Sequence, residues 1–560
     1  MADTRDKKNI EKTWDFIIIG TGIGGGTIGH ALAQAGKSVL FCERGRSYFG
    51  DQEALAGDFL DALVPDPRST ISDHDKARAG RFSGQIFDAT NGRKIPIQPM
   101  IGIGTGGSSA LYGMVMERMF SEDFEPGANF PDATDANIPR SWPISYDDLA
   151  PYYTAAEKLY EVRATRDALR PSEERGIADP RPFSPATNEI AEHFRSRGMH
   201  PYHVPVACAQ VDGCQECVGY LCSRQCKRDS VMACLKPALD NFGAEILTEC
   251  EIETLEIAEG RVAAVNARRR GDAVKLHART VILAAGAIHT PAILLRSGGP
   301  EGVSNGSGQV GRNLMRHFID YYLVYPKADV RGGLLKQLAL NDLYRKDGVK
   351  LGTIQSNGQL PLPSSLALSF RENLKAIWPP LAKLFPLIRP LVEMRAAQLR
   401  AGAYAMVAFG EDLPYQRNRI FLSDARKHIN LSYSISRQDQ KRLETFRKLI
   451  IEALRPFRAK TIFRAHQNFV LGHVCGTCRF GDDPATSVLD RNNRSHEISN
   501  LYVTDASFFP TSSGTNPSLT IAANALRVAD VILGKTHVSR GVDDVLVYAS
   551  QPVDDVNPSA

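Results

Sequence analysis

Two polar residues near the end of the chain have side chains suited to proton and hydroxyl chemistry. His473 lies in the run Gly-His-Val-Cys-Gly-Thr-Cys, and Asn516 precedes Pro517 at the start of an apolar, helix-like segment. A near-neutral imidazole can accept a proton, and a carboxamide can hold the same oxygen by a hydrogen bond. A lone histidine is more often structural, and an asparagine beside a proline often only caps a helix. The pair therefore indicates catalysis only if a cofactor lies beside it.

Cysteines form a second group of reactive side chains. Six of the ten lie in one short region, namely Cys208, Cys214, Cys217, Cys222, Cys226 and Cys234. Four of them have the spacing C-x2-C-x4-C-x3-C. Thiolates so close in sequence can surround a soft metal, and an intracellular chain seldom uses them for disulfides. Three interpretations stay open: an iron–sulfur cluster, structural thiols or disulfides, and zinc. Cys475 and Cys478 are a redox pair or simply pack, and we assign them no chemistry.

The segment that would hold a cofactor begins near the N-terminus. The apolar run 16–19 is typical of a buried parallel strand, and a G-x-G-x-x-G motif follows at once, before a helical pattern. In this motif Gly20 permits a tight turn, Gly22 lets the backbone approach a pyrophosphate, and Gly25 lets the helix pack on the strand. The N-terminus of that helix offers unpaired N–H groups to the anion.

An acidic residue completes the motif. A second strand-like run, residues 38–42, leads to Glu43, about 20 residues after the glycines, where an acid would bind a ribose hydroxyl. The charge of Glu43 would repel a 2′-phosphate, so FAD or NAD fits better than NADP. A strand before, a helix after and an acid in place predict a dinucleotide site rather than an isolated turn.

A second glycine-dense segment spans residues 102–109. It is either a flexible surface loop or backbone laid against a large flat ligand, because only glycine lets the main chain come so close.

The rest of the chain alternates between strand-like and helix-like patterns. Strand-like runs return over residues 245–283, with a turn at Glu259-Gly260, and alternating residues within 402–436 predict an antiparallel sheet. Helices are expected over residues 27–35, 150–160, 291–296, 438–454 and 518–533.

Composition excludes several classes of protein. Hydrophobic content of 43%, charged content of 23% and a net charge of +4 are those of an ordinary globular chain without a nucleic-acid-binding arm. No stretch of 18 uncharged apolar residues predicts a membrane span, and the first residues lack an export signal. We therefore expect a cytoplasmic protein, or one bound peripherally at the inner membrane.

Residues 370–400 are unusual in composition. Apolar side chains alternate with Lys375, Lys383, Arg389 and Arg395, and prolines 379, 380, 386 and 390 are expected to break the segment into short pieces. The segment is either a helical cover over the substrate entrance or a basic amphipathic patch that rests on a membrane surface.

Several sequence blocks together resemble the glucose-methanol-choline (GMC) family of FAD-dependent oxidoreductases over nearly the whole chain. Besides the N-terminal glycine motif with Glu43, they are Gly104-x-Gly-Gly-Ser-Ser, 142–149, 284–288, 310–315, Glu411-Asp-Leu-Pro, Asn418-Arg419, 500–505 and 515–521. Among the members, the chain is most similar to bacterial dehydrogenase catalytic subunits, such as FAD-dependent glucose, sorbitol and gluconate dehydrogenases.

The resemblance implies a mixed α/β fold. A doubly wound, Rossmann-like FAD-binding domain would comprise residues 1–155, 240–325 and 465–540. A substrate-binding domain built on an antiparallel sheet would comprise residues 156–239 and 326–464, including the cysteine-rich loop 208–234, and residues 541–560 would form a tail.

The resemblance also implies roles for individual residues. The ADP half of FAD would be held by Gly20, Gly22, Gly25 and Glu43, and the isoalloxazine would be lined by Gly104, Gly106, Gly107 and Ser108. Asp505 would contact the ribityl-phosphate region. His473 would be the general base and Asn516 would hydrogen-bond the same oxygen. The helix that begins near Pro517 would direct its positive end at the reduced flavin. Tyr112 and Arg316 are not the residues that the family pattern has at these positions. His317, which follows Arg316, matches the pattern.

The implied activity is the FAD-dependent oxidation of an alcohol, sugar or polyol hydroxyl to a carbonyl. Electrons would pass to a quinone, a cytochrome, an iron–sulfur relay or an acceptor subunit. The alternatives are an oxidase that makes hydrogen peroxide and a non-redox lyase. Cys217, Cys222 and Cys226 resemble the ligands of a three-iron–four-sulfur cluster. Cys214 is an alternative ligand, because Glu216 stands where the pattern has another cysteine.

Overall fold

The computed structural model describes most of the chain. The described residues are 10–48, 53–56, 72–82, 84–97, 99, 101–171, 173–214, 216–331, 335–360, some positions between 363 and 374, 378–465 and 471–535. The predicted tail, residues 541–560, and the first residues, on which the expectation about export rests, lie outside these ranges.

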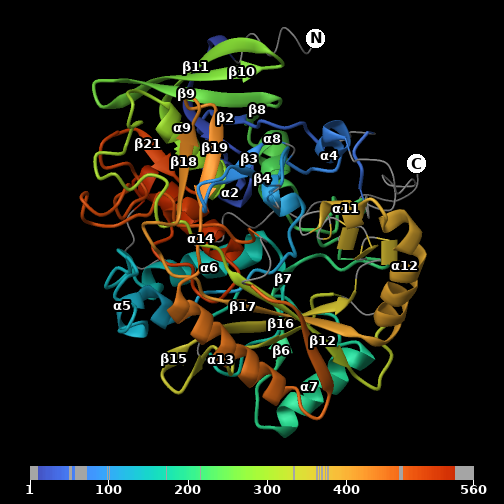
Figure 1. The fold of residues 1–560 in the computed structure, drawn as a ribbon. Coiled ribbons are helices and arrows are strands. Elements are labelled where there is room, and N and C mark those ends of the chain that lie inside the picture. Colours follow the sequence, from blue (N-terminus) through green and yellow to red (C-terminus); the bar gives the residue numbers. More distant parts are fainter. Residues whose placement is uncertain are drawn as a thin grey trace.

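A parallel sheet forms one end of the molecule (Figure 1). Its strands are β8 (Glu245–Leu247), β2 (Val39–Cys42), β1 (Thr13–Ile19) and β11 (Asp272–Leu283), with β21 (Leu501–Val503) also paired to β11. Ile17, Ile18 and Leu40 are fully buried, as expected for strands covered on both faces. The strand predicted after the N-terminus is therefore confirmed.

The N-terminal part of β11 pairs with an antiparallel hairpin. β9 (Cys250–Ala258) and β10 (Arg261–Arg269) pair with each other, and β10 pairs with β11. Glu259 and Gly260 both have positive φ, 51° and 67°, and turn the chain between the two strands. This confirms the predicted turn.

Helices cover the parallel sheet. They are α2 (Ile23–Gln34), α6 (Tyr146–Leu159), α8 (Lys236–Asn241), α9 (Gly286–Arg296) and α14 (Ser518–Ile532). α14 packs against both α2 and α6 and is buried along almost its whole length, which explains its apolar sequence. It lies between the two large sheets of the molecule (Figure 1).

The second large sheet is antiparallel, as predicted. In order, its strands are β20 (Arg458–Phe463), β12 (Phe318–Tyr325), β17 (Tyr404–Gly410), β16 (Gly352–Gln359), β13 (Leu338–Leu340) and β6 (Tyr202–His203). Helices α7 (Pro185–Ser196) and α13 (Arg437–Ala453) cover the face that carries Tyr322 and Met406. Val407 and Phe409 point to the opposite face, because side chains alternate along a strand. This second face is the one that matters for function.

Short elements complete the fold. They are α4 (Asp73–Arg78), β3 (Ile86–Asp88), β4 (Ile95–Ile97), η1 (Gly107–Ala110), η2 (Ser121–Phe124), α5 (Pro126–Asn129), β5 (Val162–Arg163), β7 (Val206–Ala207), η3 (Val231–Leu235), β14 (Arg345–Lys346), β15 (Val349–Lys350), α11 (Pro379–Ala382), β18 (Arg419–Ser423), β19 (His428–Ser432) and η4 (Ala506–Phe508). The combination of a parallel sheet with helices and a separate antiparallel sheet confirms the predicted mixed α/β class.

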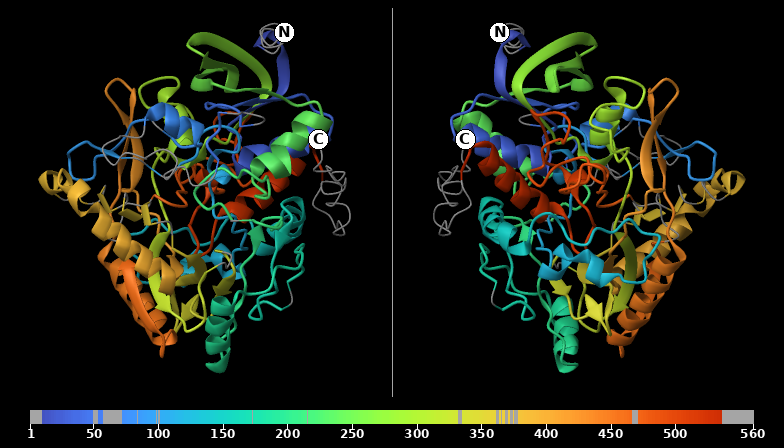
Figure 2. Two further views of the ribbon diagram at one scale, coloured as in Figure 1. Left: turned by 90° about the vertical axis from the view of Figure 1, so that its right-hand side faces the viewer. Right: turned by 90° about the vertical axis from the view of Figure 1, so that its left-hand side faces the viewer.

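The expectation that prolines break residues 370–400 into short pieces holds only in part. Pro379 and Pro380 lie in the short helix α11 (Pro379–Ala382), but α12 (Phe385–Gly402) is one helix of 18 residues that stands at the outer edge of the molecule (Figures 1 and 2). Pro386 lies in its first turn, where no intrahelical N–H bond is lost, and the helix continues through Pro390. Ile377 and Lys375, which the prediction also used, lie outside the described residues. Among the described residues, no helix is both long enough and apolar enough to cross a membrane.

Candidate active site

The N-terminal glycines have two different roles. A side chain at Gly20, whose φ is +102°, would place its Cβ 2.4 Å from the carbonyl oxygen of Ala284, and a Cβ at Gly25 would lie 2.1 Å from that of Gly20. These two positions require glycine for packing. A Cβ at Gly22 would meet its nearest protein atom, the oxygen of Gly106, at 4.0 Å. Gly22 therefore borders open space into which a ligand can bring a phosphate.

The carboxylate of Glu43 joins the two glycine-rich segments. Its Oε2 accepts hydrogen bonds from the N–H and hydroxyl of Thr21 (3.3 and 2.7 Å). Its Oε1 accepts from the N–H groups of Gly45 and Gly104 (3.0 and 3.1 Å). A Cβ at Gly107 would lie 3.4 Å from the Cα of Gly22, so the two glycine-rich segments lie against each other. Glu43 organises this cradle, and its contact with a ribose stays a prediction.

Other predicted cofactor residues lie around the same region. Gly106 and Gly107 have positive φ, 86° and 50°, and Ser108 accepts a hydrogen bond from the N–H of Gly102 (3.1 Å). The carboxylate of Asp505 accepts from the N–H of Gly286 (2.9 Å) and also from Thr290 and Ser507. Burial raises the pKa of Asp505. In this structure Asp505 holds the start of α9 against η4, and a contact with the ribityl chain stays a prediction.

Two long helices begin without a side-chain cap. The N-cap residues are Gly22 for α2 and Pro517 for α14, and neither helix has a capping hydrogen bond from a side chain. Their first N–H groups and the positive ends of their dipoles thus remain available to anionic groups. With the space beside Gly22, these features fit the pyrophosphate and the flavin of FAD.

His473 belongs to a chain of two imidazoles. Nε2 of His317 lies 3.0 Å from the carbonyl oxygen of Ser512, and Nδ1 of His317 lies 2.8 Å from Nδ1 of His473. A carbonyl oxygen only accepts, so His317 carries its proton on Nε2 and has a lone pair on Nδ1. His473 must then donate from Nδ1. This arrangement leaves Nε2 of His473 unprotonated, so that its lone pair is available to a ligand.

Both imidazoles are held neutral. Burial lowers the pKa of His317 to about 4. Burial, followed by repulsion from the protonated form of His317 and from Lys336, keeps the pKa of His473 well below the usual 6.5. His473 is therefore a proton acceptor over a broad range of pH.

Asn516 is oriented by a residue of the antiparallel sheet. Its Oδ1 accepts a hydrogen bond from Nε2 of Gln355 on β16 (2.6 Å), which leaves the amide N–H groups of Asn516 for another partner. Gln355 pairs with Val407, and Phe409 lies two residues along the same strand as Val407. Gln355 and Phe409 therefore share one face of the sheet as diagonal neighbours, about 7–8 Å apart. The ring of Phe409 lies 5.3 Å from that of His473, so both polar residues are held over this face.

Comparison with known proteins decides the family. Family models described as GMC oxidoreductase match residues 15–319 and 414–525, which together are well over half of the chain. The chain belongs to the GMC oxidoreductase family.

Relatives extend along nearly the whole length of this GMC chain. It is 27% identical to paromamine 6'-oxidase of Streptomyces fradiae, over 95% of this chain and 93% of that protein. It is 24% identical to the fructose dehydrogenase large subunit of Gluconobacter japonicus, over 93% and 97%. The solved structure of pyridoxine 4-oxidase from Mesorbium loti has a TM-score of 0.63 at 20% identity and covers 94% of this chain and 100% of its own, which shows a shared fold. The predicted family, the oxidoreductase class and FAD as the cofactor are thereby confirmed.

Some residues of this GMC site were not predicted from the sequence. The sequence pattern identifies His317 only as the neighbour of Arg316. It does not identify Gln355, Phe409 or Lys336 as site residues. Gln355 is a polar residue on a fully buried strand position, a signal that points to a buried hydrogen-bond partner. No comparable signal marked the others, because their neighbours are distant in sequence.

The two departures from the family pattern have structural partners. The backbone N–H of Arg316 donates to Asp412 (3.0 Å), and its side chain donates to the carbonyl of Ala465 (2.9 Å). The hydroxyl of Tyr112 donates to the carbonyl of Arg228 (2.6 Å) and its ring packs against the cysteine-rich loop. Neither residue disturbs the chain of imidazoles.

The cysteine-rich loop brings its thiols together. The Sγ atoms of Cys208 and Cys214 are 3.6 Å apart, those of Cys214 and Cys226 are 3.4 Å apart, and those of Cys226 and Cys222 are 3.5 Å apart. A hydrogen bond with Cys222, and then burial, raise the pKa of Cys217, which lies beside this group. All ten cysteines are in the described residues and none forms a disulfide. Cys208, absent from the predicted ligands, thus joins the group, whereas Cys234 hydrogen-bonds to Tyr160 instead.

Proposed function

We propose that this GMC oxidoreductase oxidises an alcohol, sugar or polyol hydroxyl to a carbonyl, with His473 as the base. The observation that carries the proposal is the tautomer chain from the Ser512 carbonyl through His317, which leaves Nε2 of His473 as an acceptor. When bound, FAD supplies the acceptor for a hydride. Sequence similarity to relatives named as an oxidase and a dehydrogenase supports this chemistry.

The protein groups would act on one hydroxyl. Nε2 of His473 takes the hydroxyl proton while the carbon loses its hydride, so the imidazole becomes an imidazolium. Nδ1 of His473 stays hydrogen-bonded to His317, which holds the ring in place. An N–H group of Asn516, whose orientation Gln355 maintains, donates to the same oxygen. The two contacts orient the carbon–hydrogen bond, and such positioning accounts for much of the rate.

Anaerobic mixing of the FAD-loaded protein with a panel of alcohols, polyols and sugar acids tests this function. Bleaching of the flavin absorbance by any of them supports it. If none reduces the flavin, the proposal fails and the non-redox alternative gains support. Rapid reoxidation by air with release of hydrogen peroxide identifies an oxidase, whereas slow reoxidation identifies a dehydrogenase with another acceptor, such as a quinone, a cytochrome or an acceptor subunit.

We also infer that the thiol group holds a metal centre, with Cys208, Cys214, Cys222 and Cys226 as its core. Thiolates favour soft metals and iron–sulfur clusters, and the close contacts among these buried and partly buried thiols fit such a donor set. Compared with the predicted ligands Cys217, Cys222 and Cys226, this set adds Cys208 and omits Cys217. Cys214, predicted as an alternative ligand, becomes a full member.

Metal analysis of anaerobically purified protein tests this inference. We expect about one equivalent of bound centre in the wild type and its loss in Cys226→Ser, because Cys226 contacts two other thiols. Cys234→Ser, outside the group, should keep the metal. Iron with acid-labile sulfide identifies the three-iron cluster, and zinc without sulfide identifies a single-ion site. Protein free of both metals contradicts the inference.

We further infer that α12 rests on a membrane surface. Leu384, Leu387, Leu391 and Met394 follow one another at helical spacing, and their side chains are 50–79% exposed. Basic residues lie on the same helix, including Arg389 and Arg395. An exposed apolar stripe with neighbouring cations is typical of a helix that lies in a membrane interface.

Flotation with vesicles that contain anionic lipid tests the contact. Because a buried leucine contributes about 1.5–3 kcal/mol, we expect Leu387→Ser with Leu391→Ser to reduce vesicle binding by at least about tenfold. Val349→Ser, at an exposed apolar site elsewhere, serves as the control. Wild-type protein that does not float with the vesicles would rule the contact out.

A further inference from the structure

A buried lysine lies near the proposed base and forms no ion pair within the described residues. Lys336 is only 6% exposed. Its Nζ lies 5.9 Å from the centre of the Phe409 ring, and the same ring lies 5.3 Å from the ring of His473. Within the described part of the chain, the ammonium group donates no hydrogen bond and meets no carboxylate at ion-pair distance. A buried cation without a partner is costly, so a ligand that brings a negative charge would be stabilised there.

The acidic residues described around this site form no ion pair with the ammonium group of Lys336. The carboxylate of Glu216 accepts hydrogen bonds from the backbone N–H of Lys336 (2.8 Å) and from Gln210 (3.4 Å), not from the ammonium group. Asp123 and Glu411 both form ion pairs with Lys350. Burial lowers the pKa of Lys336 to about 8, with partial compensation by Glu216, so the residue is still mainly charged at neutral pH.

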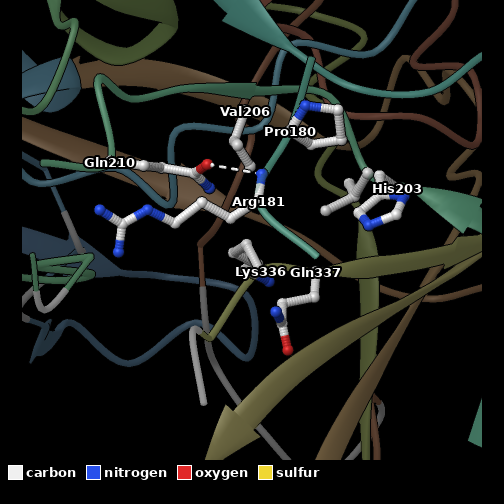
Figure 3. Close-up of a pocket in the computed structure, with 8 residues that line it drawn as sticks. Pro180, Arg181, His203, Val206, Gln210, Lys336 and Gln337 are labelled. Atoms are coloured by element: carbon white, nitrogen blue, oxygen red, sulfur yellow. Dashed lines mark hydrogen bonds between the residues drawn. The ribbon is translucent and has the colours of Figure 1, made fainter. Parts of the chain in front are cut away.

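Lys336 also lines a small pocket that is basic. The ionisable residues in its wall are Arg181, His203 and Lys336, and the wall contains no acid (Figure 3). Nε2 of His203 is buried and has no hydrogen-bond partner among the residues that the structure describes. Arg181 is itself paired with Asp212 (2.9 Å), so among the described residues Lys336 is the cation of this wall that lacks an ion pair.

We propose that Lys336 binds a carboxylate of the substrate, so that the enzyme prefers hydroxy acids to neutral alcohols of the same skeleton. This inference rests on the proposed function and specifies its substrate class. One ammonium group matches the single charge of a carboxylate, whereas a phosphate dianion is usually held by a bidentate arginine or by several cations. The same charge repels cationic amino sugars.

Calorimetric titration of the FAD-loaded protein with matched pairs, such as D-gluconate and D-glucitol, tests the proposal. We expect each acid to bind about tenfold or more tightly than its alcohol, the size of a hydrogen bond to a charged group. In Lys336→Met this preference should fall to about one, because acid binding weakens, and in Lys336→Arg it should be retained in part. Lys346→Met, the same change at an exposed lysine, should behave as the wild type.

Two results would overturn the proposal. One is a wild-type protein that binds no acid of the panel more tightly than its alcohol. The other is a preference that survives in Lys336→Met. Reduction of the flavin by neutral alcohols alone would leave the proposed oxidation intact and remove only this inference, whereas failure of every hydroxy compound to reduce the flavin would count against the oxidation itself.

Discussion

The His473→Ala variant should reduce its flavin about 10²–10⁴-fold more slowly than the wild type, the range typical of a lost general base. Without the imidazole, the hydroxyl proton has no acceptor as the hydride leaves. FAD should stay bound at the wild-type ratio, because His473 does not contact the glycine cradle formed by Gly22, Gly106 and Glu43. Anaerobic stopped-flow absorbance measures the rate, and the ratio of flavin to protein absorbance measures occupancy. Turnover at the wild-type rate would contradict the role of His473.

Variants of His317 separate positioning from packing. The side-chain carbonyl introduced by His317→Gln can still accept the Nδ1–H of His473, whereas the hydrocarbon side chain introduced by His317→Leu cannot. We therefore expect His317→Leu to lose much more of the reduction rate than His317→Gln, with FAD retained in both. Equal losses would indicate that His317 only fills space.

The pH profile gives a second measurement on the same pair. A lowered pKa means that His473 stays neutral as the pH falls through 6.5, so the wild-type rate of flavin reduction should not decline there. In His317→Gln, the contribution of His317 to that lowering is lost and the pKa of His473 rises. The acid limb of the profile should then move to higher pH.

The Lys350→Met variant should be less stable than the wild type by about 3–5 kcal/mol, the cost of breaking a buried ion pair. Lys350 is 1% exposed and pairs with Asp123 and with Glu411 (2.6 Å). Its removal leaves two buried carboxylates without a cation, and burial disfavours their charged forms. Denaturant unfolding of the FAD-loaded protein measures the difference.

The same exposed lysine as before provides the control for stability. Lys346→Met removes a charge from the surface of the same region, so its free energy of unfolding should stay within about 0.5 kcal/mol of the wild type. Lys350→Met with wild-type stability would show that the two carboxylates are protonated in the folded protein. The network also reaches the active site, because Tyr344 donates to Asp123 and accepts from the N–H of Gly514, two residues before Asn516.

Local sequence determined the cofactor cradle and most of the elements around it. The strand before Gly20, the helix after it, the turn at Glu259-Gly260 and the helix that follows Pro517 were all predicted, because each depends on residues within one or two turns of the chain. The continuous helix α12 was not, since prolines near a helix start are compatible with helix and the pattern alone did not place that start. A dinucleotide, FAD or NAD, was predicted for the same reason as the cradle, since the glycine motif and Glu43 are neighbours in sequence, and the family resemblance selected FAD.

Only the tertiary structure decided how the reacting groups are arranged. His317 and His473 meet across 156 residues, and Gln355 reaches Asn516 across 161. Lys336, in the bend before β13, lies beside Phe409 of β17, and Cys208 joins a group of thiols that the spacing alone did not include. Whether one nitrogen of an imidazole can accept a proton depends on what its other nitrogen contacts. Whether a buried cation is paired depends on which carboxylates lie near it. Both properties depend on contacts between distant segments, which a residue type and its near neighbours do not specify.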